Sequence, residues 1–241
     1  MPISVVQTAV NQITTLSNTW DATFSSAVTP GNLVVIIARL GTANRTLGAP
    51  AYTGGGGTFS SVVVNANGSH GGLVMWSRIE DTSGVTVYRA TIASSLTARG
   101  SITAYELSGA DGATATSSGT GTQASTTTSP RMLDSGLDIP SGGIMIGGIS
   151  TSVANDVSWG TLTDPADFTR TLGVNSGTGQ ASHFIGYRTL SGTAIQGTAT
   201  VTTARAVYGL AAVWSEAATG QPYAKRWGGV PHFGGRSLRR W

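Results

Sequence analysis

Residues 30–38 have the sequence Pro-Gly-Asn-Leu-Val-Val-Ile-Ile-Ala, and this stretch decides the fold class. Its first three residues have the composition of a turn, and the four β-branched residues Val34–Ile37 follow. β-Branched side chains favour extended backbone, and an unbroken apolar run this short is typical of a strand buried on both faces. The stretch therefore predicts a turn followed by a central β-strand.

A second stretch, residues 141–149, repeats this pattern as Ser-Gly-Gly-Ile-Met-Ile-Gly-Gly-Ile. When Leu33 is aligned with Ile144, Trp76 and Tyr187 each lie 43 residues further on. A repeat of this length is too long for a solenoid or propeller unit and suits two copies of a four-stranded antiparallel unit. The later matches pair Gly84–Val87 with Gly197–Val201, and Ile102–Glu106 with Tyr208–Trp214.

These patterns predict an all-β protein, an antiparallel jelly-roll β-sandwich built from two related halves with an extended C-terminal arm. We expect the sandwich at 1–218, its halves at about 28–111 and 139–217, and the arm at 219–241. No charged or proline-rich linker follows the first half, which favours one interleaved sandwich over two separate domains. The Gly-, Ser- and Thr-rich residues 112–129 fit either a linker or a lightly decorated strand.

One difference between the two stretches predicts a packing contact. Gly147 and Gly148 stand where the first stretch has Ile36 and Ile37. The glycines leave room for a bulky neighbour, so we expect a large side chain, Trp214 or Trp159, to lie over them.

The composition supports many short strands joined by turns. Charged residues make up 10% of the 241 residues, against about 25% in ordinary soluble domains, and 34 residues are glycine. The absence of cysteine excludes disulfides and thiolate metal sites. We expect neither a signal peptide nor a transmembrane segment, because no apolar run approaches the roughly 18 residues that a membrane span needs.

The basic isoelectric point of about 9.6 comes from the C-terminus. Residues 225–241 carry five cations and no acid, whereas the rest carries nine arginines against eleven acids. The body of the protein is therefore nearly neutral, which argues against a dedicated nucleic-acid-binding protein.

Catalysis has little support in the sequence, and we predict neither an enzyme nor a metal or other cofactor. The histidines, His70, His183 and His232, lack metal-ligand spacing. Glycoside cleavage needs two carboxyl groups at a fixed separation across the sugar. The acidic pairs Glu80-Asp81 and Asp164/Asp167 instead have turn compositions, with calcium at an acidic loop as the alternative.

Aromatic side chains suggest two binding surfaces. Trp76 and Trp214 lie at strand centres and are expected in the core, whereas Trp159 lies near a loop and is the candidate for stacking on a glycan. The second surface is the arm, where aromatic residues alternate with cations. Such a segment fits docking on an acidic protein surface, with packing on its own sandwich and nucleic acid as rivals. The expected docking residues are Tyr223, Lys225, Arg226, Trp227, Phe233, Arg239, Arg240 and Trp241.

Four motifs together resemble a known family. They are Pro-Gly-Asn with its strand (30–37), a Trp-containing strand (73–79), Gly-Val-Thr-Val (84–87) and Tyr-Glu-Leu-Ser-Gly (105–109). This pattern, over residues 28–216, is similar to jelly-roll, lectin-like β-sandwiches among virion structural proteins of tailed bacteriophages. Residues 222–241 resemble the short basic-aromatic C-termini of phage structural proteins.

The resemblance implies a non-enzymatic role in assembly or attachment, as a capsid decoration protein or a head or tail component. The expected partners are other virion proteins, a major capsid or tail protein, and further copies of the chain in a homo-oligomer. The expected location is the virion, assembled in the host cytoplasm, without membrane contact. A carbohydrate-binding module for host adhesion is the alternative.

Overall fold

The computed structural model describes residues 1–41, 46–52, 58–67, 71–92, 97–151, 163–174, 183–201 and 205–218. Within these ranges the secondary structure is entirely β, which confirms the predicted all-β, antiparallel class. The strands are β1 (Ser4–Ser17), β2 (Thr19–Thr23), β3 (Leu33–Leu40), β4 (Ala51–Tyr52), β5 (Ser60–Asn67), β6 (Gly71–Ile79), β7 (Val87–Thr91), β8 (Ala98–Ser108), β9 (Ser117–Thr127), β10 (Leu137–Ile139), β11 (Ile144–Thr151), β12 (Thr169–Val174), β13 (His183–Arg188), β14 (Gly192–Ile195) and β15 (Arg205–Trp214).

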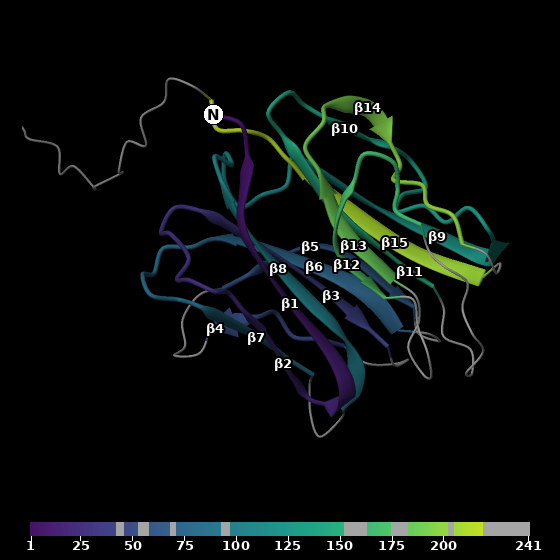
Figure 1. The fold of residues 1–241 in the computed structure, drawn as a ribbon, viewed down its shortest axis with the longest axis horizontal. Coiled ribbons are helices and arrows are strands. Elements are labelled where there is room, and N and C mark those ends of the chain that lie inside the picture. The colour runs from purple at the N-terminus through teal and green to yellow at the C-terminus, as the bar shows by residue number, and fades with distance from the viewer. Residues whose placement is uncertain are drawn as a thin grey trace, which may run out of the picture.

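Two five-stranded antiparallel sheets form the centre of the molecule (Figure 1). The first sheet has the order β1-β8-β3-β6-β5 and the second sheet has the order β9-β15-β11-β13-β12. Numbered by their sequence within each sheet, the strands of both follow the order 1-5-2-4-3. A jelly roll mixes strands of both halves in each sheet. Here each sheet takes its strands from one continuous segment, so these orders do not show the jelly-roll arrangement.

Two smaller sheets cover the outer faces. The first cover sheet, β2-β7-β4, packs on the first sheet, and the second cover sheet, β10-β14, lies on the far side of the second sheet (Figure 1). Three apolar clusters fill the spaces between the resulting four layers. The middle cluster takes side chains from both five-stranded sheets, so their inner faces pack against one another.

Strand β3 is buried along its whole length because it contributes to two of these clusters. Leu33, Val35 and Ile37 face the second sheet, whereas Val34 and Ile36 face the first cover sheet. β11 alternates in the same way and is also buried throughout. The continuous apolar run is therefore explained by a sheet with packed layers on both sides.

The glycine pair of β11 does face bulky side chains, but the expectation of Trp214 was wrong. A Cβ on Gly147 would lie 2.7 Å from the sulfur of Met132, and one on Gly148 would lie 3.1 Å from Cδ1 of Ile37. Trp214 instead pairs with Ile144, the first residue of β11. Trp159 lies outside the described residues.

The turn before β3 is held by Glu80, which directly follows β6, and by Glu106 of β8. Gly31 has a φ of 96°, which an L side chain rarely adopts, and its N–H donates to the Glu80 carbonyl. The buried Glu106 carboxylate of β8 accepts from the Asn32 amide at 2.6 Å and from the Thr29 N–H at 2.9 Å. The Pro-Gly-Asn turn is therefore held by hydrogen bonds to the buried residues Glu80 and Glu106 and is not a free loop.

Two further predictions are settled by the strands. Residues 117–127 form β9, so this Gly-, Ser- and Thr-rich segment is a strand, as one of the two predicted alternatives had it. The turns at Glu80-Asp81 and at Asp164–Asp167 are also confirmed, with bends or turns at residues 82–84 and 166–167. The domain boundaries and the jelly-roll arrangement remain predictions.

Candidate functional site

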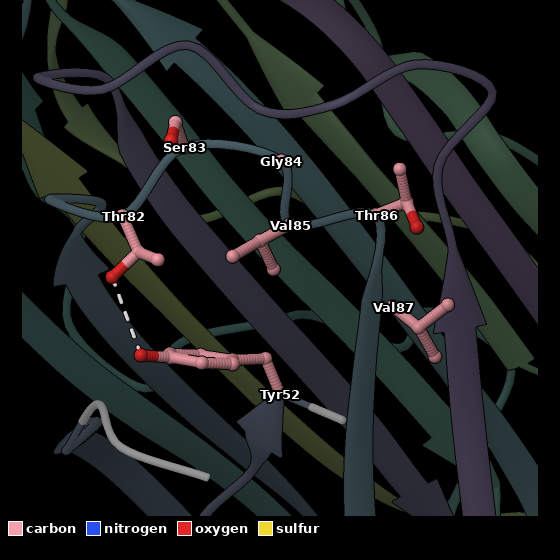
Figure 2. A pocket seen from close by; sticks show the side chains of 7 residues that line it. All are labelled: Tyr52, Thr82, Ser83, Gly84, Val85, Thr86 and Val87. Carbon is pink, nitrogen blue, oxygen red and sulfur yellow. Dashed lines mark hydrogen bonds between the residues drawn. The ribbon is translucent and has the colours of Figure 1, made fainter. Parts of the chain in front are cut away.

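A small cavity of about 270 Å³ lies beside the turn that leads into β7 (Figure 2). The half-buried ring of Tyr52 bounds it on one side, and the turn residues from Thr82 onward bound it on the other. The Tyr52 and Thr82 hydroxyls lie 3.2 Å apart and share a hydrogen bond. The described residues that line it are Tyr52, Thr82, Ser83, Gly84, Val85, Thr86 and Val87.

The buried Glu80 carboxylate holds this turn in place through hydrogen bonds. Its Oε1 accepts from the N–H groups of Asp81 at 3.1 Å and Thr82 at 3.0 Å, and its Oε2 accepts from the Tyr88 hydroxyl at 2.6 Å. Burial, followed by the hydrogen bond to Glu80, raises the pKa of Tyr88 well above its usual range. The phenol therefore stays a hydrogen-bond donor to Glu80.

Arg78 joins the turn to the aromatic side of the cavity. Its guanidinium lies 5.6 Å from the centre of the Tyr52 ring and 5.7 Å from that of Phe59, within cation–π range. It also donates to Asp81 at 2.6 Å and to Glu80 at 3.3 Å. The negative charges of Glu80 and Asp81 are therefore both paired with Arg78.

The cavity offers hydroxyl groups and one aromatic ring, a chemistry suited to contact with a sugar. Among the described residues that line it, none carries a carboxylate, imidazole or amine that could act as an acid or base at neutral pH. The nearest acids, Glu80 and Asp81, hold the turn in place. The described hydroxyl groups of the lining can donate and accept hydrogen bonds to a polar ligand.

The second candidate site is the outer edge of β1, at the border of the first sheet (Figure 1). This 14-residue strand carries no charged side chain. Val6, Val10 and Leu16 are 51%, 42% and 61% exposed. Within the described part of the chain, β1 pairs only with β8. Its pairing is regular from Gln7 to Ile13, between two irregularities. A long, uncharged edge strand is a ready template for pairing with another strand.

Strand β9, which occupies the same position in the second sheet, has part of its outer edge covered. The Asp134 N–H donates to the Thr120 carbonyl at 3.1 Å, and the Thr122 N–H donates to the Asp134 carboxylate at 3.2 Å. Asp134 thus forms hydrogen bonds with two backbone groups on the outer edge of β9. The corresponding edge of β1 has no such backbone cover within the described ranges, so the two sheets differ in their capacity to pair with another chain.

The structure places only some of the predicted site residues. Trp159 and all the docking residues of the arm lie outside the described residues. Trp76 and Trp214 are buried, as predicted, and so is Trp20. His183 is buried between the sheets, and Asp164 and Asp167 pair with Arg170 and Arg188. No group of three potential metal ligands gathers among the residues that the structure describes.

Tyr52 was missed by the sequence analysis. It lies in residues 41–58, which have a loop-like composition, and directly before the glycine run at 54–57. A lone aromatic residue in such a polar segment was the available signal, because aromatic side chains in loops are often held by tertiary contacts.

No protein-family model, curated protein or solved structure matches the chain. Because the described ranges contain no helix, they contain none long and apolar enough to cross a membrane. Inferences about function therefore rest on the strand edge, the cavity and the sequence patterns.

Proposed function

We propose that this chain is a non-enzymatic structural subunit that self-associates through the outer edge of β1, as a component of a tailed-phage virion. The single observation that carries this proposal is the uncharged, exposed 14-residue edge of β1. Proteins that remain monomeric usually protect such edges with lysine, proline or a covering segment. The virion setting comes from the four motifs that resemble phage structural proteins and from the basic-aromatic arm.

The strand orders support a chain made of two related units. Both five-stranded sheets follow the order 1-5-2-4-3, and each has a cover sheet on its outer face. In this proposal the units pack face to face through the middle cluster. One interleaved jelly roll is the alternative, which the separate origin of the two sheets disfavours.

The difference between β1 and β9 predicts a closed assembly. Two β1 edges that pair antiparallel around Val10, the centre of the regular stretch Gln7–Ile13, would form a continuous ten-stranded sheet with two-fold symmetry. Because Asp134 covers part of the edge of β9, the second sheet does not offer an equivalent site for further growth. We therefore expect dimers and not open filaments.

In the same proposal the arm attaches the dimer to the particle. Residues 225–241 carry five cations and no acid, and the aromatic residues among them supply anchors for a protein surface. The partner is an acidic surface of a major capsid or tail protein. Localisation to the virion, after assembly in the host cytoplasm, follows from this role.

Self-association is tested by light scattering coupled to size-exclusion chromatography. The wild-type chain is expected to elute as a dimer. Val10→Lys would place two cations opposite each other across the proposed interface and is expected to give a monomer. Val64→Lys is the matched control, because Val64 is 50% exposed on β5, at the opposite edge of the same sheet. A wild-type monomer, or equal behaviour of the two variants, would overturn the proposal.

The cavity beside Tyr52 favours a second candidate function, adhesion to a glycan. Its ring and hydroxyl groups match the chemistry of a sugar-binding site. A glycan array with the wild-type chain, Tyr52→Ala and Trp159→Ala separates the possibilities. Binding lost only in Tyr52→Ala would assign adhesion to this cavity, loss only in Trp159→Ala would assign it to the predicted stacking residue, and no binding by the wild type would remove the candidate.

A further inference from the structure

Arg39 interrupts the apolar contact between the two five-stranded sheets. Leu33, Val35 and Ile37 precede it on the same face of β3, and all three contribute to the middle cluster. The Arg39 side chain is also fully buried. Its Nε donates to the Ser150 hydroxyl on the facing strand β11 at 3.1 Å. A long cationic side chain therefore lies between two packed sheets.

Four side chains form a closed polar ring at this point. Arg39 and Ser101 are cross-strand partners in the first sheet, and Ser150 and His183 are partners in the second sheet. Two hydrogen bonds join the sheets, one from Arg39 to Ser150 and one between the Ser101 hydroxyl and His183 Nε2 at 3.1 Å. All four residues are buried.

The ring contains no negative charge to balance Arg39. Both Nη1 and Nη2 of the guanidinium are buried without a hydrogen-bond partner. Among the described residues, none of the ion pairs involves Arg39. Burial lowers the pKa of Arg39 to about 10, so the side chain remains charged at neutral pH. A buried, unpaired charge with four unused N–H donors is strongly destabilising, and proteins normally supply a counter-charge.

A glycine, Gly41, lies directly against the guanidinium. A Cβ at Gly41 would lie only 2.8 Å from Nη1 of Arg39 and 2.9 Å from the Arg99 carbonyl. Gly41 itself is partly exposed. Any larger residue at this position would therefore press on the guanidinium.

We propose that the ring of Arg39, Ser101, Ser150 and His183 is a binding site for a small inorganic anion, held by the two free Nη groups of Arg39. A charged guanidinium with free donors selects an anion. The close packing of the two sheets around the fully buried guanidinium favours a small anion, such as a halide, over a phosphorylated metabolite. The bound anion would act as a structural ion that joins the two sheets, independently of self-association through β1.

Chloride is the first probe. The midpoint of thermal unfolding of the full chain is measured while potassium chloride replaces potassium gluconate at constant ionic strength. The wild-type midpoint is expected to rise by about 5–10 °C once chloride exceeds its Kd about 100-fold. Arg39→Met should remove this dependence. Arg89→Met, which removes an exposed arginine paired with Asp21, is the matched control and should keep it. No chloride dependence in the wild type, or the same dependence in Arg39→Met, would overturn the proposal.

Two further measurements keep the proposal testable if Arg39→Met fails to fold. Crystals grown in bromide should show an anomalous peak beside the Arg39 guanidinium, and a map without this peak would contradict the site.

Asp156 is the one acid outside the described residues and is the rival source of negative charge. If Asp156→Asn destabilises the chain and wild-type stability does not depend on chloride, the counter-charge is internal and the anion site is refuted.

Discussion

The Asn32 amide donates to the Glu106 carboxylate at 2.6 Å, across 74 residues of sequence. The other carboxylate oxygen accepts from the Gln7 side chain of β1, also at 2.6 Å. One buried acid thus ties the turn before β3 to the edge strand. Two motifs that are separate in sequence, Pro-Gly-Asn and Tyr-Glu-Leu-Ser-Gly, are therefore parts of one junction, which positions the β1 edge.

Glu106→Gln should destabilise the protein by about 1–3 kcal/mol. The carboxylate accepts from Gln7, Thr29 and Asn32, whereas a glutamine amide presents donors on one side and leaves at least one of these groups unpaired. Urea unfolding followed by tryptophan fluorescence measures the change. Asp111→Asn, which alters an exposed acid, is the control, and an equal effect of both substitutions would show that the junction contributes nothing specific.

Arg78→Met should be far more damaging than Arg89→Met. Removal of the Arg78 guanidinium leaves the fully buried Glu80 carboxylate without the cation that pairs with it among the described residues, which costs about 3–5 kcal/mol. Arg89 and Asp21 form an exposed pair, whose loss should lie within experimental error. Urea unfolding of both variants checks this order, and a small effect of Arg78→Met would mean that Glu80 needs no counter-charge.

The face-to-face packing of the two sheets predicts a coupling between Ile37 and Gly148. A methyl group on Gly148 would meet Cδ1 of Ile37 at 3.1 Å, so Gly148→Ala should cost about 1–3 kcal/mol. Ile37→Val removes that Cδ1 and should recover at least about 0.5 kcal/mol in the double variant. Ile36→Val is the matched control, because Ile36 faces the first cover sheet and should be additive with Gly148→Ala.

Deletion of residues 222–241 should leave a folded protein that no longer joins the particle. The described sheets end at Trp214, and the deletion removes all five C-terminal cations. The truncated and full-length chains are compared by circular dichroism and by their abundance in purified particles of the virion to which the proposal assigns the chain. Normal occupancy by the truncated chain would reject docking through the arm.

The sequence predicted the strands better than their assembly. The β-branched run Val34–Ile37 favours extended backbone, and the buried tryptophans follow from their strand positions. Sequence spacing does not say which layers meet, so the separate sheets and their cover sheets were not foreseen. The contact of Asn32 with Glu106 joins residues far apart in the chain, so the sequence did not indicate it. The burial of Arg39 was not predicted either, because a charged residue at the end of an apolar strand has the pattern of an exposed strand end.

The most direct test of self-association through β1 is hydrogen–deuterium exchange of its backbone amides at two protein concentrations. In the wild-type chain, exchange between Gln7 and Ile13 should slow as concentration rises, because pairing with a second copy protects the outward N–H groups. In Val10→Lys these amides should exchange rapidly at both concentrations. Protection that is independent of concentration, or that persists in Val10→Lys, would contradict the proposed interface.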